Sequence, residues 1–316
     1  MPEALSVATV ESLLSPWRGP RRVAEVHPLD GGLMNRNYRI RFAGSSERFV
    51  LRFFDRDPAA CAKEAAVLTL VRGDVPVPDV LHAEPSGSAS FPPFLVLEFI
   101  DGISLRELKK RGDLQSIGEA AHDAGRVLAG LSRRRFDHSG LLTPELTIEP
   151  GVFENATTSG LIDHFASSFV FQRRIDAALT ERVKEWARSR ESRHTQPISV
   201  SLAHGDFNAA NVFVREENGR WIVAAILDWE FVFAGSVFCD IGNMLRYERT
   251  ERPRFEPHFS RGCMDGGLQL GDDWRQLARL ADLPALCELL TRDAVPESVV
   301  DELRGLIAAT VGAEGI

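Results

Sequence analysis

Residues 204–211 read His-Gly-Asp-Phe-Asn-Ala-Ala-Asn, and this stretch decides the fold. Asn211 stands five residues after Asp206, and a second aspartate, Asp228, follows the apolar run at 221–227. The apolar run at 198–203 precedes the stretch, so we expect a strand that delivers it to a tight loop. Three side chains with oxygen atoms thus stand close to the ends of predicted strands.

A β-hairpin explains the spacing between Asn211 and Asp228. Residues 216–219 read Glu-Glu-Asn-Gly, and Asn-Gly between apolar runs is the strongest short-range signal for a hairpin. Residues 211–214 therefore run out as one strand and 221–227 return as the next. The hairpin is predicted to bring Asp228 back beside Asn211.

These three side chains suit phosphoryl transfer. Asp206 can orient an acceptor hydroxyl and take its proton as the oxygen attacks phosphorus. Asn211 and Asp228 offer hard oxygen ligands for magnesium, which takes one or two protein ligands besides phosphate and water. The alternative is a chance His-Gly-Asp tripeptide in a turn, and the hairpin spacing argues against it.

Length and composition limit the class of protein. The chain has 316 residues, 44% of them hydrophobic, and a formal net charge of -8. The length predicts two lobes, each with its own core, and the charge argues against nucleic acid or an anionic membrane as the main partner. No signal-peptide pattern or membrane-spanning apolar run is apparent, so we expect a cytoplasmic protein. Four widely spaced cysteines predict buried free thiols.

The order of predicted elements divides the chain near Asp101 and Gly102. A β-rich part with one helix comes first, and a larger, mostly helical part with a small β insert follows. We predict lobes at 1–101 and 102–316 with a ligand cleft between them. The main predicted elements are strands at 23–29, 37–42, 48–54 and 94–100, and helices at 58–72, 114–131 and 161–188.

At the quoted residues the chain resembles the aminoglycoside phosphotransferase and choline kinase group. His204 to Asn211 looks like the catalytic loop of that group, and Asp228 stands where protein kinases have Asp-Phe-Gly. The resemblance implies an α+β, bilobal, protein-kinase-like fold that uses ATP and Mg²⁺. It makes Asp206 catalytic and Asn211 and Asp228 metal ligands, and it gives His204 and Asp240 supporting roles.

The resemblance extends to the N-terminal part. Gly31, Gly32 and Asn35 are similar to the loop that covers the nucleotide phosphates. Arg52 stands where most kinases have the lysine that grips the α- and β-phosphates. Two interpretations of Arg52 remain open. It follows a coding bias in a chain with only four lysines, or it marks weakened ATP binding.

Three further residues are assigned from the same resemblance. Glu64 matches the helix carboxylate that pairs with the basic residue. The Glu98 carbonyl and the Ile100 N–H match the hinge that holds adenine. The alternative for Glu98 is a carboxylate at a strand edge.

The acceptor is the least determined part. In the resembling group it is bound by the helical lobe, here residues 161–188 and 247–310. Acidic residues of the second segment either meet an amino sugar or form a solvated face; they are Glu251, Glu256, Asp265, Asp272 and Asp273.

The sequence therefore predicts an ATP- and Mg²⁺-dependent kinase whose acceptor is a small molecule with a hydroxyl group. The alternatives are a catalytically weak, nucleotide-binding regulator and a nucleotidyl transferase.

Overall fold

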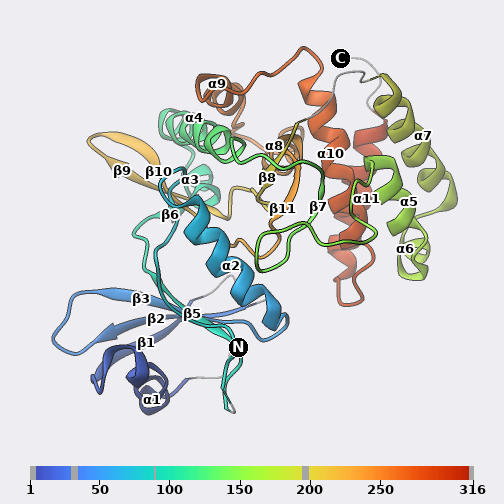
Figure 1. Cartoon of the computed structure of the whole chain (residues 1–316). Helices are drawn as coiled ribbons and strands as arrows, with labels where there is room; N and C mark the ends of the chain where they lie inside the picture. Colours follow the sequence, from blue (N-terminus) through green and yellow to red (C-terminus); the bar gives the residue numbers. More distant parts are fainter. Residues whose placement is uncertain (1–4, 30–34, 89, 194–198, 313–316) are drawn as a thin grey trace.

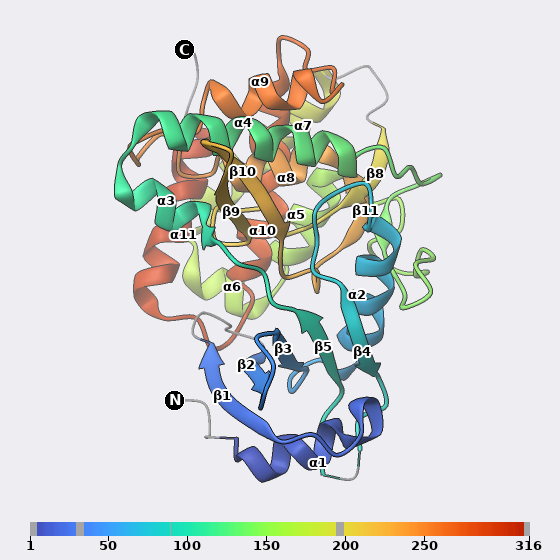
Figure 2. The same cartoon turned by 90° about the vertical axis from the view of Figure 1, so that its left-hand side faces the viewer.

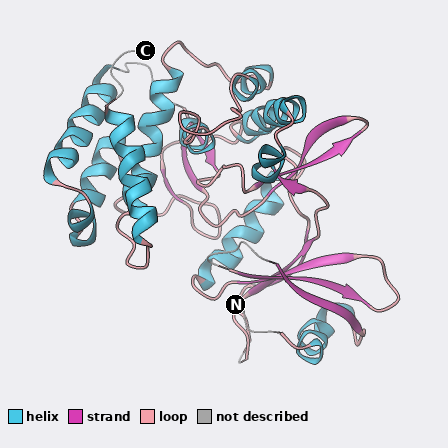
Figure 3. Ribbon diagram, turned by 180° about the vertical axis from the view of Figure 1, so that it is seen from behind, coloured by secondary structure: helices cyan, strands magenta, loops and turns pink. Residues whose placement is uncertain are grey.

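The computed structural model describes residues 5–29, 35–88, 90–193 and 199–312 (Figure 1). An antiparallel sheet forms the N-terminal part, and most helices belong to the larger C-terminal part (Figure 3). The α+β fold predicted from the sequence is therefore confirmed. The predicted boundary between residues 101 and 102 stays a prediction.

Five strands form the N-terminal sheet in the order β1-β2-β3-β5-β4, and all neighbours are antiparallel. Helix α1 lies at the far end of the molecule, and α2 lies between the sheet and the C-terminal part (Figure 2). The bounds are α1 (Val7–Arg18), β1 (Val23–Leu29), β2 (Arg36–Phe42), β3 (Arg48–Phe53), α2 (Pro58–Val71), β4 (Val80–Glu84) and β5 (Phe94–Glu98).

Both faces of β5 are covered, which explains its continuous apolar sequence. Phe94 and Val96 belong to the buried cluster that includes α1, whereas Leu95 and Leu97 belong to the cluster that includes α2. Successive side chains of a strand point to opposite faces, so a strand covered on both faces loses the polar alternation.

Helices dominate the C-terminal part, together with two small three-stranded sheets ordered β10-β9-β6 and β7-β11-β8. The bounds are β6 (Ile103–Ser104), α3 (Leu105–Arg111), α4 (Leu114–Leu131), β7 (Gly140–Leu141), α5 (Thr158–Ala166), α6 (Phe169–Arg174), α7 (Ala177–Arg193), β8 (Val200–Ala203), β9 (Val212–Glu217), β10 (Arg220–Ile226), β11 (Phe233–Ser236), α8 (Val237–Met244), α9 (His258–Asp265), α10 (Trp274–Leu289) and α11 (Glu297–Val311).

The predicted hairpin is present as β9 and β10. Glu217 pairs with Arg220, so the turn consists of Asn218 and Gly219, both with positive φ. Two such residues favour the tight turn that matches strand twist. At the open end, the N–H of Leu227 donates to the carbonyl oxygen of Asn211 at 2.9 Å. The residue after Leu227 is Asp228, which therefore returns beside Asn211.

The prediction of one helix over residues 161–188 is wrong, because the chain forms α5, α6 and α7 there. Ser167 follows α5, and its hydroxyl donates to the carbonyl oxygen of His164 at 2.6 Å. Asp176 precedes α7, and its carboxylate accepts the N–H of Leu179 at 2.8 Å. Short polar side chains compete in this way for backbone groups and divide a helix.

Two N-terminal elements were not predicted. Helix α1 contains Pro16, which normally argues against a helix. All five residues of β4 are half-buried, so the strand lacks the polar and apolar alternation that sequence patterns reveal. The N-terminal part therefore has two helices rather than the expected one.

Two predictions concern the whole chain: that the cysteines are buried free thiols and that no apolar run spans a membrane. All four cysteines are free; Cys61, Cys263 and Cys287 are buried and Cys239 is half-buried. Within the described ranges, none of the helices combines the length and the apolarity needed to cross a bilayer.

Close packing of α4 on α9 depends on two glycines. A Cβ at Gly125 would overlap the carbonyl oxygen of Phe259, and a Cβ at Gly262 would overlap the carbonyl oxygen of His122. The two backbones therefore approach more closely than any larger residue allows. This contact fixes α4, whose inner face forms part of the core behind the site described below.

We expect Gly262→Ala to lower the free energy of unfolding by about 1–3 kcal/mol, because the added methyl group meets rigid backbone. Gly305→Ala is the matched control at an exposed position of α11, where an added Cβ meets nothing within 4 Å. It should raise the free energy of unfolding by about 0.5–1 kcal/mol. Urea unfolding measures both, and a stabilising Gly262→Ala would contradict the close contact.

Candidate active site

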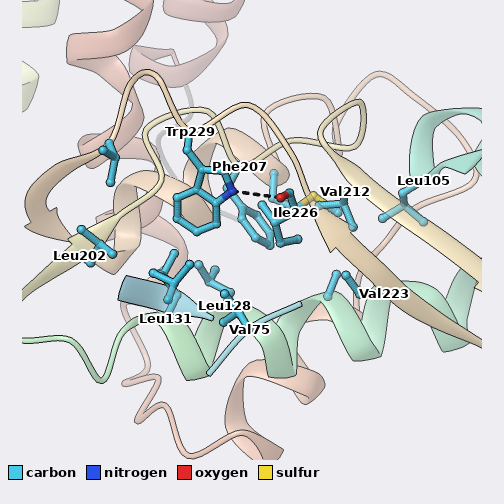
Figure 4. Packing of buried hydrophobic residues seen from close by; sticks show 14 of the residues in the cluster. Val75, Leu105, Leu128, Leu131, Leu202, Phe207, Val212, Val223, Ile226 and Trp229 are labelled. Carbon is cyan, nitrogen blue, oxygen red and sulfur yellow. Dashed lines mark hydrogen bonds between the residues drawn. The ribbon is translucent and has the colours of Figure 1, made fainter. Parts of the chain in front are cut away.

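Two buried aromatic side chains anchor the polar residues of the site. Phe207 follows Asp206, Trp229 follows Asp228, and both rings are fully buried in the cluster that also contains Leu128 and Leu131 of α4 (Figure 4). The indole N–H of Trp229 donates to the carbonyl oxygen of Ile226 at 2.9 Å. Each aspartate thus stands beside a residue fixed in the core.

Asp240 on α8 holds the start of the 204–211 loop. Its carboxylate accepts the backbone N–H groups of His204 at 2.8 Å and Gly205 at 3.0 Å. Burial raises the pKa of Asp240 to about 7, and the two N–H donors oppose that rise. The structure therefore gives Asp240 contacts with the loop backbone.

His204 connects this loop to the end of β10. Its Nε2 lies 3.0 Å from the carbonyl oxygen of Leu227, and its Nδ1 accepts the N–H of Asp206 at 3.1 Å. An acceptor at Nδ1 requires the neutral ring with its proton on Nε2. Burial lowers the pKa of His204, which favours the same neutral form.

Three amide groups surround the carboxylate of Asp206. Asn208 and Asn243 donate to Oδ1 at 2.7 and 3.3 Å, and Asn211 donates to Oδ2 at 2.8 Å. An ionised carboxylate accepts hydrogen bonds only, so three donors suit it. Asn208 and Asn243 were not predicted from the sequence. Asn208 lies within the quoted stretch, but Asn243 lies 37 residues away on α8.

Arg52 on β3 is the centre of a buried charge cluster. Its Nε lies 3.3 Å from Oε2 of Glu64 on α2, and its Nη2 donates to the carboxylate of Asp228. Burial raises the pKa of Glu64 to about 7 against the opposing effect of Arg52. Burial also lowers the pKa of Arg52, but Glu64 and Asp228 outweigh it and raise this pKa above its usual value. The cluster joins the predicted phosphate-binding and metal-binding residues.

Hydrogen bonding in this cluster is incomplete. Among the described residues, Arg52 Nε and Glu64 Oε2 have no hydrogen-bond partner although they form an ion pair. Unsatisfied buried polar atoms are rare in proteins and call for a functional or structural reason. Asp228 adds backbone strain, because its φ of 68° lies in the left-handed region.

Glu230 belongs to the same cluster, although the sequence did not assign it a role. Its carboxylate accepts the side-chain N–H of Asn35 at 2.9 Å. Burial raises the pKa of Glu230, as does the charge of Asp228, while Arg52 opposes both. Asn35, predicted in the nucleotide-covering loop, is thus linked to the segment that carries Asp228. Gly31 and Gly32 lie outside the described residues.

The predicted hinge residues lie at the end of β5. The side chain of Glu98 is exposed, and its carboxylate lies 3.3 Å from the N–H of Asp79 as an acceptor. Ile100 is half-buried two residues later. The Glu98 side chain is thus engaged by the Asp79 backbone, and the adenine contacts, which were predicted for backbone groups of Glu98 and Ile100, stay predictions.

The oxygen atoms of the site fit magnesium. Asn211 uses its side-chain nitrogen for Asp206, so its side-chain oxygen is available as a hard ligand, and Asp228 and Glu230 offer carboxylate oxygens of the same kind. In the described part of the chain, no group of three or more His, Cys, Asp or Glu side chains could hold a metal alone. A magnesium ion here would complete its shell with phosphate oxygens and water.

The family follows from comparison with known proteins. A family model described as "Phosphotransferase enzyme family" matches residues 25–297. The chain belongs to this phosphotransferase family. Among curated proteins, none matches it significantly.

Solved structures share the fold over nearly the whole chain. Aminoglycoside phosphotransferase APH(4)-Ia is 16% identical, with a TM-score of 0.69 and coverage of 97% of this chain and 99% of that chain. The GDP complex of a mutant of aminoglycoside 2'-phosphotransferase-IIIa is 17% identical, with a TM-score of 0.70 and coverage of 97% of this chain and 98% of that chain. A ternary complex of an APH(4)-Ia mutant with AMP-PNP and hygromycin B is 18% identical, with a TM-score of 0.68 and coverage of 96% and 98%. Because these identities are low, the similarity establishes a shared fold and nothing more.

A pocket of about 590 Å³ opens beside the 204–211 loop of this phosphotransferase. Asn208 and Asn243 line it, and both donate to Asp206. Helix α3 and the segment of residues 246–255 that follows α8 supply most of the remaining wall, and α11 contributes Glu302. Its volume is in the range of small-molecule sites.

We expect Gly205→Ala to unfold at lower urea concentration than the parent protein. Gly205 has a φ of 80°, and an added Cβ would overlap the carbonyl oxygen of Phe231. Gly219→Ala is the control, with a similar φ of 76° but nothing within 4 Å of the added Cβ. The control should lose about 1–2 kcal/mol from backbone strain alone, and Gly205→Ala should lose more. Equal losses would contradict the steric role of Gly205.

Proposed function

We propose that this protein transfers the γ-phosphoryl group of ATP to a hydroxyl group of a small molecule. The observation that carries the proposal is the Asp206 carboxylate, held by three amide donors between the Arg52 cluster and a pocket of small-molecule size. The fold of the APH(4)-Ia ternary complex with AMP-PNP and hygromycin B supports it. We further propose a cytoplasmic location and lobes at 1–101 and 102–316.

Asp206 would align the acceptor hydroxyl and take its proton as the oxygen attacks the γ-phosphorus. The bond from that phosphorus to the β-phosphate oxygen breaks, and ADP leaves. The amide groups of Asn208, Asn211 and Asn243 fix the carboxylate without adding charge. Such catalysis depends mainly on positioning.

Arg52 would bind the α- and β-phosphates of ATP, with Glu64 orienting its guanidinium group. Its five N–H donors suit phosphate oxygens. Bound magnesium would neutralise phosphate charge, with Asn211, Asp228 and Glu230 as its protein ligands. In the structure described here Asp228 pairs with Arg52. Nucleotide binding would therefore replace the ion pair of Arg52 with Asp228 by contacts between Arg52 and the phosphates.

Replacement of Asp206 tests the catalytic role. We expect Asp206→Asn to lower kcat about 100-fold to 10,000-fold, while ATP still binds in a thermal-shift assay. Asp74→Asn is the control, because exposed Asp74 pairs with Arg134 outside the site. An exposed ion pair contributes about 0–1 kcal/mol, so this control should keep kcat. Near-normal turnover by Asp206→Asn would remove Asp206 from the mechanism.

Replacement of Arg52 separates charge from shape. Arg52→Lys keeps a cation near Glu64 and should keep ATP turnover with a moderately higher KM for ATP. Arg52→Gln leaves two carboxylates without their counter-charge and should destabilise the protein by about 3–5 kcal/mol. It should also weaken ATP binding in calorimetry at a temperature where it is folded. Equal ATP affinity in both variants would contradict phosphate binding by Arg52.

The two alternatives give different products. A nucleotide-binding regulator would bind ATP and magnesium without releasing ADP in the presence of any acceptor. A nucleotidyl transferase would add an adenylyl group, which mass spectrometry of the acceptor distinguishes from a phosphoryl group.

A further inference from the structure

The pocket beside Asp206 has an uneven charge. Asn208 and Asn243 connect it to the Asp206 carboxylate by single hydrogen bonds, so a molecule in the pocket lies one side chain from the predicted base. Five cationic residues and three acidic residues line it. The cations are Arg106, Lys109, Lys110, Arg246 and Arg252, and the acids are Glu248, Glu251 and Glu302.

The acidic side chains already have donors within the protein. Glu251 pairs with Lys109 at 2.8 Å, and Glu302 accepts the hydroxyl of Tyr247 at 2.6 Å. Glu248 accepts the backbone N–H groups of Phe255 at 2.8 Å and Glu256 at 3.3 Å. Each acidic side chain therefore already accepts a hydrogen bond within the protein, and Glu251 is neutralised by Lys109.

The cationic side chains divide into two sets. Lys109 and Arg246 are neutralised, Arg246 by two hydrogen bonds to Asp282 at 2.6 and 2.9 Å. Arg252 donates to carbonyl oxygens of residues 248 and 251, which leaves its charge unpaired. Arg106 and Lys110, both exposed, have no ion-pair or hydrogen-bond partner for their side chains in the ranges that the structure describes.

The position of Arg106 relative to the loop is fixed by the backbone. Its N–H donates to the carbonyl oxygen of Ala209 at 2.7 Å, so the first turn of α3 is attached to the 204–211 loop. The side chains of Arg106 and Lys110 lie four residues apart, and residues at this spacing share one helix face. That face contributes two of the three unpaired cationic charges to the pocket.

We propose that the acceptor is an anion, a hydroxylated molecule with a carboxylate or phosphate group that Arg106 and Lys110 bind. This inference rests on the proposed kinase function and specifies its substrate class. The anionic group lies toward α3 and the hydroxyl group toward Asp206. The same charges oppose polycationic acceptors.

Two acidic residues farther along the segment after α8 pair with other residues outside the pocket. Glu256 pairs with Arg275 at 2.9 Å, and Asp265 pairs with His122 and Arg261 at 3.0 Å each. Neither residue lines the pocket. Of the acidic residues considered for an amino sugar, Glu256 and Asp265 therefore do not contribute to this pocket, whereas Glu251 lines it and pairs with Lys109.

Binding of charge-matched sugars tests the pocket without turnover. Glucuronate, glucose 6-phosphate, glucose and glucosamine share a pyranose ring and differ in charge, and calorimetry measures the affinity of each. We expect the two anions to bind more tightly than glucose, and glucosamine to bind most weakly. Arg106→Gln and Lys110→Gln should each weaken anion binding about tenfold, since a hydrogen bond to a charged group contributes that much.

Arg111→Gln is the matched control. Arg111 lies on the same helix, pairs with Glu107 at 3.2 Å and does not line the pocket. It should leave anion binding unchanged. Equal effects of all three substitutions, or tighter binding of glucosamine than of glucuronate, would overturn the anionic assignment.

Turnover separates this inference from the proposed function. ADP release and product mass are measured with the same four sugars and with glycerate, glycerol and 3-amino-1,2-propanediol. Phosphorylation restricted to neutral or cationic compounds keeps the kinase and overturns the anionic acceptor. Anion binding that depends on Arg106 and Lys110, without phosphorylation of any compound, keeps the anion site and counts against the proposed kinase. Phosphorylation of anions, with KM raised by Arg106→Gln and Lys110→Gln but not by Arg111→Gln, supports both.

Discussion

The site depends on the burial of two aromatic side chains that follow its two main aspartates. Phe207 and Trp229 are each fully buried behind Asp206 and Asp228. Burial of such a ring contributes several kcal/mol, and its removal costs about 3–5 kcal/mol. A polar residue next to such an anchor has little freedom to move along the chain. The hydrophobic core therefore sets the distance between Asp206 and Asp228.

Near these anchors, the positive charge of Arg52 balances the negative charges of two carboxylates. Glu64 and Asp228 both approach its guanidinium group in a buried setting. Burying ions is costly, and a buried charge without its partner costs several kcal/mol. Nucleotide phosphates can satisfy Arg52 and, with magnesium, release Asp228 for metal binding. In this proposal, Arg52 and Asp228 pair with each other before the nucleotide binds. Phosphate then takes the place of Asp228 at Arg52, and magnesium takes the place of Arg52 at Asp228.

Local sequence patterns predicted local structure, but they did not predict contacts between residues that are far apart in the sequence. The hairpin from Asn211 to Asp228 followed from Asn218 and Gly219, because a two-residue turn is determined by its own backbone preferences. Asn35 and Glu230 are 195 residues apart and meet only through the tertiary fold. Asn243 reaches Asp206 from another helix. The division of residues 161–188 followed from side-chain caps that apolar periodicity does not register.

Local pairing, rather than the net charge of the chain, decides which charges the pocket presents to a ligand. The chain carries a formal charge of -8, which is compatible with a cationic substrate. In the pocket, however, the acidic groups are engaged by Lys109, Tyr247 and backbone N–H groups, whereas the side chains of Arg106 and Lys110 have no ion-pair or hydrogen-bond partner among the described residues. Screening by salt limits the effect of surface charges to a range of about 10 Å. The charges that act on a ligand in the pocket are therefore those of nearby residues that have no opposite charge as a partner. The surface can therefore be acidic while the pocket selects an anion.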